Sequence, residues 1–286
     1  MSRCFVSCDR PTTRYTNSPY FTTVPLWKLS RKIGLKRVSS RRFLSAKRMK
    51  RCENIGRRDR NSALDGRNLI AQQKFDYFLV LDFEATCEQY TKIQPIQEII
   101  EFPVVRLCGK SFSEVDRFHR YVRPTERPQL TPFCTNLTGI VQGMVDDQLP
   151  VTNVLSEFHR WLIERDLVNP KSGEKTWTFV TCGDWDLGTM LPSEANFWQL
   201  QLPSYFSEWI NLKKAFCDAK GYFPNSLMQM LNDLQIAHVG QLHSGIDDVL
   251  NICAILKQLA KEGYQFENTS YLKKGVVKGQ KAPFFG

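Results

Sequence analysis

The feature that most constrains the fold is the apolar run Tyr77-Phe78-Leu79-Val80-Leu81, which passes directly into the acidic sequence Asp82-Phe83-Glu84. A β-rich apolar run of this kind is typical of a strand buried inside a sheet. Because successive side chains of a strand point to opposite faces, we expect the carboxylates of Asp82 and Glu84 to project together where the strand ends. A single pair of this kind is most often an incidental exposed pair. It indicates a site only if other acids join it.

Four further segments predict strands, and helical periodicity dominates the second half of the chain. The predicted strands cover residues 98–107, 115–122, 177–181 and 209–212. The first two of these form an antiparallel meander with the strand at residues 77–84. The predicted helices cover residues 132–137, 151–164, 213–220, 226–234 and 246–262. This order of elements indicates an α/β fold with a mixed five-stranded sheet flanked by helices.

Charge is distributed very unevenly along the chain. Residues 1–74 contain 19 Lys or Arg against 4 Asp or Glu, a net charge of +15, so the remaining residues carry −5 of the total of +10. We expect this basic segment to be disordered, since its aliphatic residues are few and irregularly spaced. It could attract phosphate backbones, direct nuclear import, serve as an organellar transit peptide, or be a solvated tail. A folded domain is expected over residues 75–270, and a flexible tail over residues 271–286.

The cysteines and the hydropathy of the chain indicate a compartment. The nine cysteines include no pair in the CxxC spacing that zinc modules use. No apolar run approaches the roughly 18 residues of a membrane-spanning helix. We therefore expect an intracellular protein with reduced thiols and no membrane partner, in the cytoplasm, the nucleus or both. The Arg- and Ser-rich N-terminus leaves a mitochondrial location open.

A third acid follows the fourth predicted strand, which ends at Gly183-Asp184-Trp185-Asp186. The ends of neighbouring strands lie within a few ångströms of one another, so Asp186 is expected to approach Asp82 and Glu84. Asp184 is a rival for the same role, although its position also fits the N-cap of a following helix.

The strongest local motif is His243-Ser244-Gly245-Ile246-Asp247-Asp248, which opens the last predicted helix. His243 stands before this helix, and Asp248 lies in its first turns. Either residue alone is usually explained by capping or by a favourable charge near a helix N-terminus. Only their combination with the acids at the strand ends indicates a functional site.

The acids Asp82, Glu84, Asp186 and Asp248 supply hard oxygen ligands, the type that holds Mg²⁺ or Mn²⁺ rather than zinc. Four carboxylates in one pocket repel one another unless cations lie among them. Two metals about 3.5–4 Å apart relieve that repulsion, activate a water and stabilise both oxygens of a phosphodiester displacement. His243 can take the proton of that water.

In six ordered blocks, three of which contain the residues named above, the chain resembles the DEDDh 3′ to 5′ exonucleases and, within them, the ERI-type exoribonucleases of the exoribonuclease 3 and Snipper group. The resemblance covers residues 75–270. Its blocks are Val80–Cys87, Ile99–Pro103, Phe133-Cys134 with Leu137–Ile140, Gly183–Asp186, Trp209–Lys214 and His243–Asp248.

The resemblance implies an RNase H-like fold and a metal-dependent 3′ to 5′ exoribonuclease that releases nucleoside 5′-monophosphates. Its partners would be RNA 3′ ends, single-stranded or with a 3′ overhang, with DNA as a further substrate class. The implied cofactor is Mg²⁺, two ions per site, for which Mn²⁺ can substitute. We expect the chain to be a monomer.

The resemblance also assigns roles by position. The implied metal ligands are Asp82, Glu84, Asp186 and Asp248. The implied catalytic residues are Glu84 and His243, with His243 as the general base. The implied contacts with the terminal nucleotide are Glu84, Ala85 and His243, with Leu137 and Thr138 as a wall for its base or sugar.

The chain departs from the family pattern at two places. Relatives commonly have an acid where this chain has Asn136, and commonly read Arg-Pro-His where this chain reads Gln241-Leu242-His243. Loss of a cation beside the general base is expected to affect phosphate binding, rate or substrate preference. Two alternative functions stay open, namely a catalytically silent RNA-binding module on the same fold and an RNase H-like endonuclease with the same metal chemistry.

Overall fold

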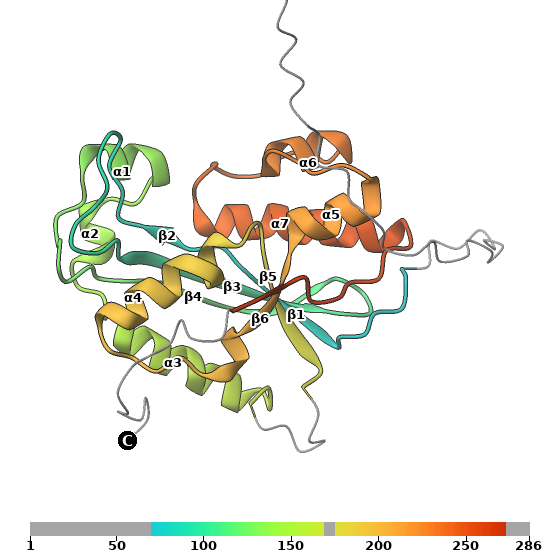
Figure 1. Ribbon diagram of the computed structural model, residues 1–286, viewed down its shortest axis with the longest axis horizontal. Coiled ribbons are helices and arrows are strands. Elements are labelled where there is room, and N and C mark those ends of the chain that lie inside the picture. The colour runs from blue at the N-terminus through green and yellow to red at the C-terminus, as the bar shows by residue number, and fades with distance from the viewer. Residues whose placement is uncertain (1–69, 169–174, 273–286) are drawn as a thin grey trace, which may run out of the picture. The chain divides into compact units, whose positions relative to one another are not determined.

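The computed structural model describes residues 70–168 and 175–272. The predicted basic segment lies outside these residues except for positions 70–74, and the predicted C-terminal tail lies outside them except for positions 271 and 272. The described part contains one mixed sheet with helices on both of its faces (Figure 1).

The sheet has seven strands in the order β2-β3-β1-β5-β6-β7, and β4 pairs with β3. The strands are β1 Tyr77–Leu81, β2 Glu84–Ala85, β3 Ile99–Cys108, β4 Glu114–Tyr121, β5 Trp177–Thr181, β6 Glu208–Asn211 and β7 Ser270–Tyr271. β1 runs antiparallel to β3 and parallel to β5, and β5 runs parallel to β6. The predicted α/β class with a mixed sheet is confirmed and each of the five predicted strands is present, but the sheet has seven strands and not five.

The first predicted strand, residues 77–84, is divided in the structure. β1 ends at Leu81, and the two-residue strand β2 begins at Glu84. Both strands pair with β3, with Leu81 opposite Val104 and Glu84 opposite Glu101. Residues 82 and 83 belong to no strand, so the pairing is interrupted where the first acid stands. The sequence does not predict β2 or β7 as separate strands, because two residues are too few to show an alternating pattern.

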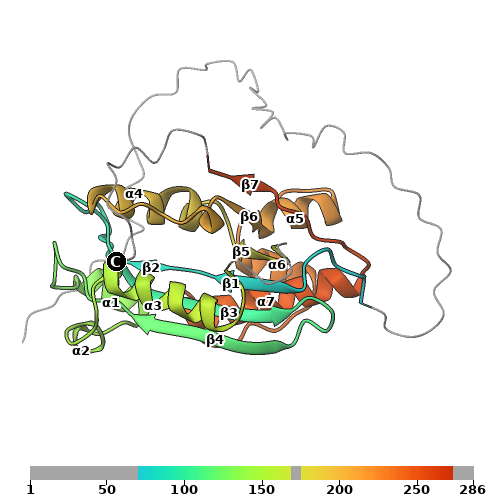
Figure 2. The same cartoon turned by 90° about the horizontal axis from the view of Figure 1, so that it is seen from below.

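Helices cover both faces of the sheet, with α3 and α4 on one face and α5, α6 and α7 on the other (Figures 1 and 2). The helices are α1 Pro132–Thr138, α2 Gln142–Val145, α3 Val151–Glu164, α4 Leu191–Phe197, α5 Leu212–Lys220, α6 Leu227–Asp233 and α7 Gly245–Lys261, with a π-helical turn η1 at Asp186–Met190 and a 3-10 turn η2 at Ser204–Phe206. The elements α2, α4, η1 and η2 are not predicted, and α2, η1 and η2 are too short to display a helical period. No helix in the described ranges is both long and apolar enough to cross a membrane.

The central strand β1 is buried on both of its faces, which explains its uninterrupted apolar sequence. Leu79 and Leu81 pack in the cluster that includes α3 and α4. Phe78 and Val80 pack in the cluster that includes α5, α6 and α7. The strand therefore lies in the middle of three layers, and the residues at its C-terminal end stand between helices from both sides.

Local chemistry sets the ends of the helices near the sheet. The side chain of Asn211 accepts a hydrogen bond from the backbone N–H of Lys214 and caps α5. Gly221 closes the same helix in the left-handed conformation, with φ of 85°. The predicted end of this helix at Lys220, followed by Gly221, is confirmed.

We expect Phe158→Ala to lower the free energy of unfolding by about 3–5 kcal/mol, because truncating a buried aromatic residue leaves a cavity. Phe158 of α3 is fully buried, and its ring centroid lies 4.9 Å from that of Phe102 and 5.2 Å from that of Phe118. Urea unfolding followed by circular dichroism measures the change. Tyr271→Ala, at a side chain that is 62% exposed, is the control and should cost less than about 0.5 kcal/mol. Equal losses in both variants would contradict this account of the core.

Candidate active site

Asp82 and Glu84 lie where β1 gives way to β2. Asp82 follows the last residue of β1 and is half-buried, whereas Glu84 is the first residue of β2 and is buried. Glu84 stands opposite Glu101 of β3. The two acids that the sequence singles out thus lie at the end of the central strand, Asp82 within the interruption of the sheet and Glu84 at the start of β2.

Asp186 reaches the same place from the neighbouring parallel strand. It is the first residue of η1, which follows β5, and its side chain is buried. Its Oδ1 accepts a hydrogen bond of 2.9 Å from the backbone N–H of Phe83, the residue between Asp82 and Glu84. Asp186 therefore lies beside the first two acids, as the strand-end argument expects.

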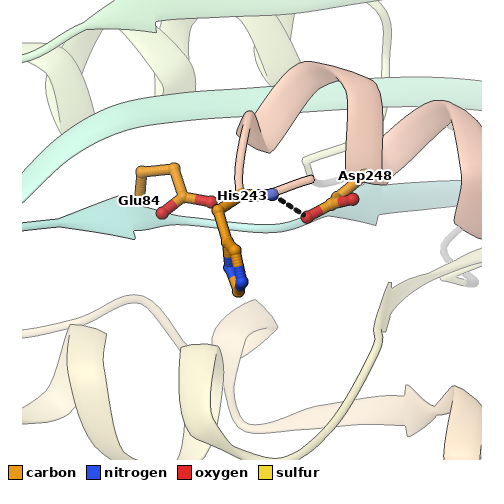
Figure 3. A group of neighbouring side chains, drawn as sticks. All are labelled: Glu84, His243 and Asp248. Atoms are coloured by element: carbon orange, nitrogen blue, oxygen red, sulfur yellow. Dashed lines mark hydrogen bonds between the residues drawn. The ribbon is translucent and has the colours of Figure 1, made fainter. Parts of the chain in front are cut away.

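The N-terminus of α7 brings the fourth acid and the histidine. Asp248, in the first turn of α7, is buried, and its Oδ2 accepts a hydrogen bond of 3.0 Å from the backbone N–H of His243. His243 has a left-handed backbone conformation, with φ of 63°, and is exposed. Three residues offer possible metal-ligand atoms that lie within 4.8 Å of one another, one atom each from Glu84, His243 and Asp248 (Figure 3). The structure thus brings all five predicted residues to one end of the central strands.

Burial and mutual repulsion dominate the electrostatics of this cluster. Burial and then the charge of Asp186 raise the pKa of Asp82 well above its usual range. Burial and then the charge of Glu101 raise the pKa of Glu84 to about 9. Burial also raises the pKa of Asp186, to about 6, and that of Asp248. Without a cation, this group of acids retains protons that solvent-exposed carboxyl groups release at much lower pH.

The donors of the cluster fit a hard divalent cation. Oδ1 of Asp248 is one of four buried side-chain polar atoms in the described residues that have no hydrogen-bond partner. A buried carboxylate oxygen without a donor is unfavourable unless a proton or a cation meets it. Mg²⁺ and Mn²⁺ prefer carboxylate oxygens of this kind. The residues present therefore suit the metal that the sequence implies.

Asp184, the rival of Asp186, is engaged elsewhere. Its Oδ2 lies 2.8 Å from Nζ of Lys214, and its Oδ1 accepts hydrogen bonds from Nε1 of Trp209 and from the hydroxyl of Ser270. These contacts connect the end of β5 to α5, β6 and β7. The capping interpretation of Asp184 is wrong, because no side chain caps η1.

Helix α1 lies beside the segment that carries Ala85. Sγ of Cys134 is 3.7 Å from the carbonyl oxygen of Ala85, to which it donates. Leu137 is half-buried on this helix, and Thr138 is buried. The Thr138 hydroxyl donates to the carbonyl of Cys134 at 2.9 Å and accepts from the N–H of Ile140 at 3.1 Å. The proton of this hydroxyl is thus engaged within α1 itself.

The departures from the family pattern lie at the end of α1 and in the loop before α7. Gly139 ends α1 with φ of 76°, and a Cβ at this position would lie 3.0 Å from Nε2 of Gln241. The N–H of Gln241 donates to Oδ2 of Asp247 at 2.9 Å. Asn136 is exposed, and Leu242 is 41% exposed. Gln241 thus packs against α1, where it occupies the space beside the left-handed glycine.

Glu101 is a buried acid beside the cluster to which the sequence alone assigns no role. Its carboxylate accepts hydrogen bonds from the N–H groups of Gly245 at 2.9 Å and Ile246 at 3.3 Å, and lies 2.8 Å from Nε2 of His119. The available signal is a single charged residue within the apolar strand Ile99-Ile100-Glu101-Phe102, since a buried charge requires partners.

Comparison with protein families identifies the class of protein that this fold and site define. The family model described as Exonuclease matches residues 79–256, a range that contains His243 and all four acids of the cluster. The chain belongs to this exonuclease family, whose DEDDh members depend on divalent metals.

Within the family, the chain is similar to the ERI-type exoribonucleases. It is 49% identical to ERI1 exoribonuclease 3 of Mus musculus over 199 residues, which cover 69% of this chain and 58% of that protein. It is 34% identical to the 3′-5′ exonuclease Snipper of Drosophila melanogaster over 215 residues, which cover 71% of this chain and 76% of that protein. The chain therefore spans little more than half the length of the ERI1 exoribonuclease 3 that it matches.

Solved structures of DEDDh exonucleases have the same architecture. The nuclease domain of 3′hExo, a DEDDh family member bound to rAMP, matches with a TM-score of 0.65 and 32% identity, over 69% of this chain and 98% of that chain. A 3′-exonuclease in 3′-end specific recognition of a histone mRNA stem-loop matches with a TM-score of 0.67 and 30% identity, over 73% of this chain and 72% of that chain. The fold is accordingly RNase H-like.

We expect the metal-free protein to lose stability as the pH rises from about 4 to about 9. Folding raises the pKa values of the acids in the cluster. Their contribution to the free energy of unfolding is therefore fully present at a pH below their pKa in the unfolded chain, and it is lost as the pH rises through their pKa values in the folded protein. The values of about 6 for Asp186 and about 9 for Glu84 set this window. Thermal unfolding in EDTA measures the effect.

The variant Asp82→Asn distinguishes the contribution of the cluster to the pH dependence of stability from that of other titrating groups, because it removes one of the repelling charges. Its melting temperature should fall less than that of the wild type between about pH 5.5 and pH 8. Mg²⁺ or Mn²⁺ should raise the wild-type melting temperature more at the higher pH, where protons compete less. Parallel pH profiles for the two proteins would contradict the proposed crowding.

Proposed function

We propose that this protein is a divalent-metal-dependent 3′ to 5′ exoribonuclease, with DNA ends as a further substrate class. The proposal rests on one observation, the meeting of four acids and a histidine from three segments of the chain at one end of the central strands. These residues are Asp82, Glu84, Asp186, His243 and Asp248. Its relatives include proteins named 3′-5′ exonuclease and exoribonuclease, which supports the same activity for this protein.

The acids are proposed to hold two Mg²⁺ ions, for which Mn²⁺ can substitute. Asp82, Glu84, Asp186 and Asp248 would supply the oxygen ligands. Bound divalent ions of this type activate water and stabilise the charge that develops on the phosphate oxygens. The chain's own contribution is to keep the ligands crowded and buried, so that cation binding relieves an existing repulsion.

His243 is proposed to be the general base. Its side chain extends from the loop before α7 on the side of Glu84 (Figure 3), and the hydrogen bond from its backbone N–H to Asp248 ties the loop to the helix. Imidazole is the side chain that most often accepts a proton in such reactions near neutral pH. In this position His243 would accept the proton of the attacking water, and Glu84 would help to orient that water.

The strand and helix beside the acids are proposed to receive the 3′-terminal nucleotide. Glu84, Ala85 and His243 would contact it, with Leu137 and Thr138 of α1 as a wall for its base or sugar. The contact between Cys134 and the carbonyl of Ala85 keeps α1 against β2 and supports this arrangement. The 3′hExo structure, which is named as bound to rAMP, supports a ribonucleotide as the ligand of this site. The proposed partner is thus an RNA 3′ end, single-stranded or with a 3′ overhang.

The basic segment, residues 1–74, is proposed to add electrostatic affinity for RNA. The rest of the chain has a net charge of −5 and does not supply it. A nuclear import or mitochondrial targeting role remains its alternative, and the proposed location is accordingly inside the cell. The proposed catalytic residues all lie outside residues 1–74.

Purified protein should shorten single-stranded RNA labelled at its 5′ end in single-nucleotide steps and release nucleoside 5′-monophosphates. A stem-loop with a 3′ tail should lose the tail, and both reactions should require Mg²⁺ or Mn²⁺ and stop in EDTA. Asp82→Asn should abolish turnover because it removes a metal ligand. Asp76→Asn, at the exposed acid before the opposite end of β1, is the matched control and should leave the rate unchanged.

A circular RNA of the same sequence separates the proposal from its alternatives. It offers no 3′ end, so it should remain intact. Its cleavage would favour an endonuclease, whereas binding of RNA without any cleavage would favour a catalytically silent binding module.

We expect His243→Ala to lower the turnover rate by roughly 10²- to 10⁴-fold, the usual contribution of a positioned general base. Because a ring nitrogen of His243 lies within 4.8 Å of ligand atoms of Glu84 and Asp248, metal affinity must be measured in the same variant, by calorimetric titration with Mn²⁺. Affinity within about threefold of the wild type agrees with a base. A collapse of affinity would instead make His243 a metal ligand.

A further inference from the structure

The N-terminus of α7 is anchored by an acid from outside the helix. Ser244 stands at the N-cap but makes no capping hydrogen bond through its side chain. The first backbone N–H groups of a helix have no partner within the helix. Glu101 of β3 supplies that partner, because its carboxylate, 1% exposed, accepts from Gly245 at 2.9 Å and from Ile246 at 3.3 Å. The position of α7 is thereby tied to the sheet by a charge-assisted contact.

The contact is close enough to require glycine. A Cβ at Gly245 would lie 2.7 Å from the carbonyl oxygen of Asp82 and 2.9 Å from Oε2 of Glu101. The same glycine is two residues after His243 and three residues before Asp248. A shift of this backbone segment relative to β1 therefore moves the proposed base and one proposed ligand relative to Asp82.

The loop that carries His243 depends on contacts at both of its ends. His243 adopts φ of 63°, a left-handed conformation that is uncommon for residues other than glycine. On the helical side, the His243 N–H donates to Asp248 at 3.0 Å and Glu101 holds the first turn of α7. On the other side, the N–H of Gln241 donates to Asp247.

His119 of β4 completes this arrangement from the neighbouring strand. Its Nε2 lies 2.8 Å from Oε1 of Glu101, while its side chain is 27% exposed. Without this partner, Oε1 of Glu101 would keep only the 3.3 Å contact to the N–H of Ile246. The carboxylate could then rotate away from the first turn of α7, and Gly245 would lose a fixed partner.

We propose that His119 and Glu101 are positioning residues, which orient the His243 loop for the reaction by fixing the first turn of α7. The inference rests on the proposed exonuclease function. His119 acts through Glu101 and has no contact with the RNA or the metals in this account. Its effect is on the placement of the base, so it should change the rate of the chemical step more than the binding of substrate.

The test is steady-state kinetics of RNA shortening by His119→Phe and His119→Gln. His119→Phe removes the hydrogen bond and should lower kcat roughly 10- to 100-fold, the cost of a small misplacement, with KM within about twofold. His119→Gln keeps an N–H donor and should restore kcat to within about threefold of the wild type. Arg117→Gln, at an exposed residue of the same strand that pairs with Glu114, is the matched control and should have wild-type kcat.

A double-mutant cycle with His243→Ala separates positioning from a general effect on folding. If His119 acts through His243, adding His119→Phe to His243→Ala should lower kcat by no more than about twofold further. A fold-loss of kcat in the double variant equal to the product of the two single-variant losses would overturn the inference. His119→Leu is measured in parallel, and loss of cooperative unfolding in both the Phe and Leu variants would also overturn it, since His119 would then serve folding alone.

Failure of the inference and failure of the proposed function are distinguishable. If the wild-type protein does not shorten RNA with Mg²⁺ or Mn²⁺, the proposed function fails. If the wild type is active and His119→Phe has the same kcat, the proposed function stands and the inference that His119 acts through Glu101 is refuted.

Discussion

The rest of the structure depends on keeping mutually repelling carboxylates together in a place with little water. Four acids meet at the C-terminal end of the central strands, where burial raises the pKa of each and the charges of neighbouring acids raise those of Asp82 and Glu84 further. An isolated pair of acids would separate or become exposed, because desolvation of each charge is unfavourable. Here each acid belongs to a different local structure, which the hydrophobic layers hold in place. Free energy gained in the apolar core therefore maintains an unfavourable electrostatic arrangement, and divalent cations can relieve it.

The backbone connects these local structures at the site itself. Parallel pairing of β1 and β5 brings the two strand ends side by side, and the hydrogen bond from Phe83 to Asp186 joins the segments beyond them. The close approach of Gly245 to Asp82 and Glu101 brings α7 against the same strand end. His243 is then the exposed residue beside a buried group of acids. Fixed positions for the proposed metal ligands, and an accessible position for the proposed base, follow from one set of contacts.

Much of this arrangement is predictable from the sequence, because its signals are local. The apolar runs before Asp82 and Asp186 indicate strands that end near an acid, and the helical period after His243 indicates a helix that begins at the motif. Three features are not predictable in this way. The interruption between β1 and β2 leaves the alternating pattern intact, the partners of Asp184 come from α5, β6 and β7, and the role of Glu101 depends on donors 144 and 145 positions away. Each depends on tertiary contacts that no single segment encodes.

The most direct test of the account is a crystal structure of the protein grown with Mn²⁺, with the ions located by their anomalous scattering. The account predicts Mn²⁺ bound by carboxylate oxygens of Asp82, Glu84, Asp186 and Asp248, at about 2.0–2.3 Å, with His243 outside the coordination sphere. Mn²⁺ bound by His243 and Glu84 without Asp82, or no Mn²⁺ among these acids at saturating concentration, would contradict it.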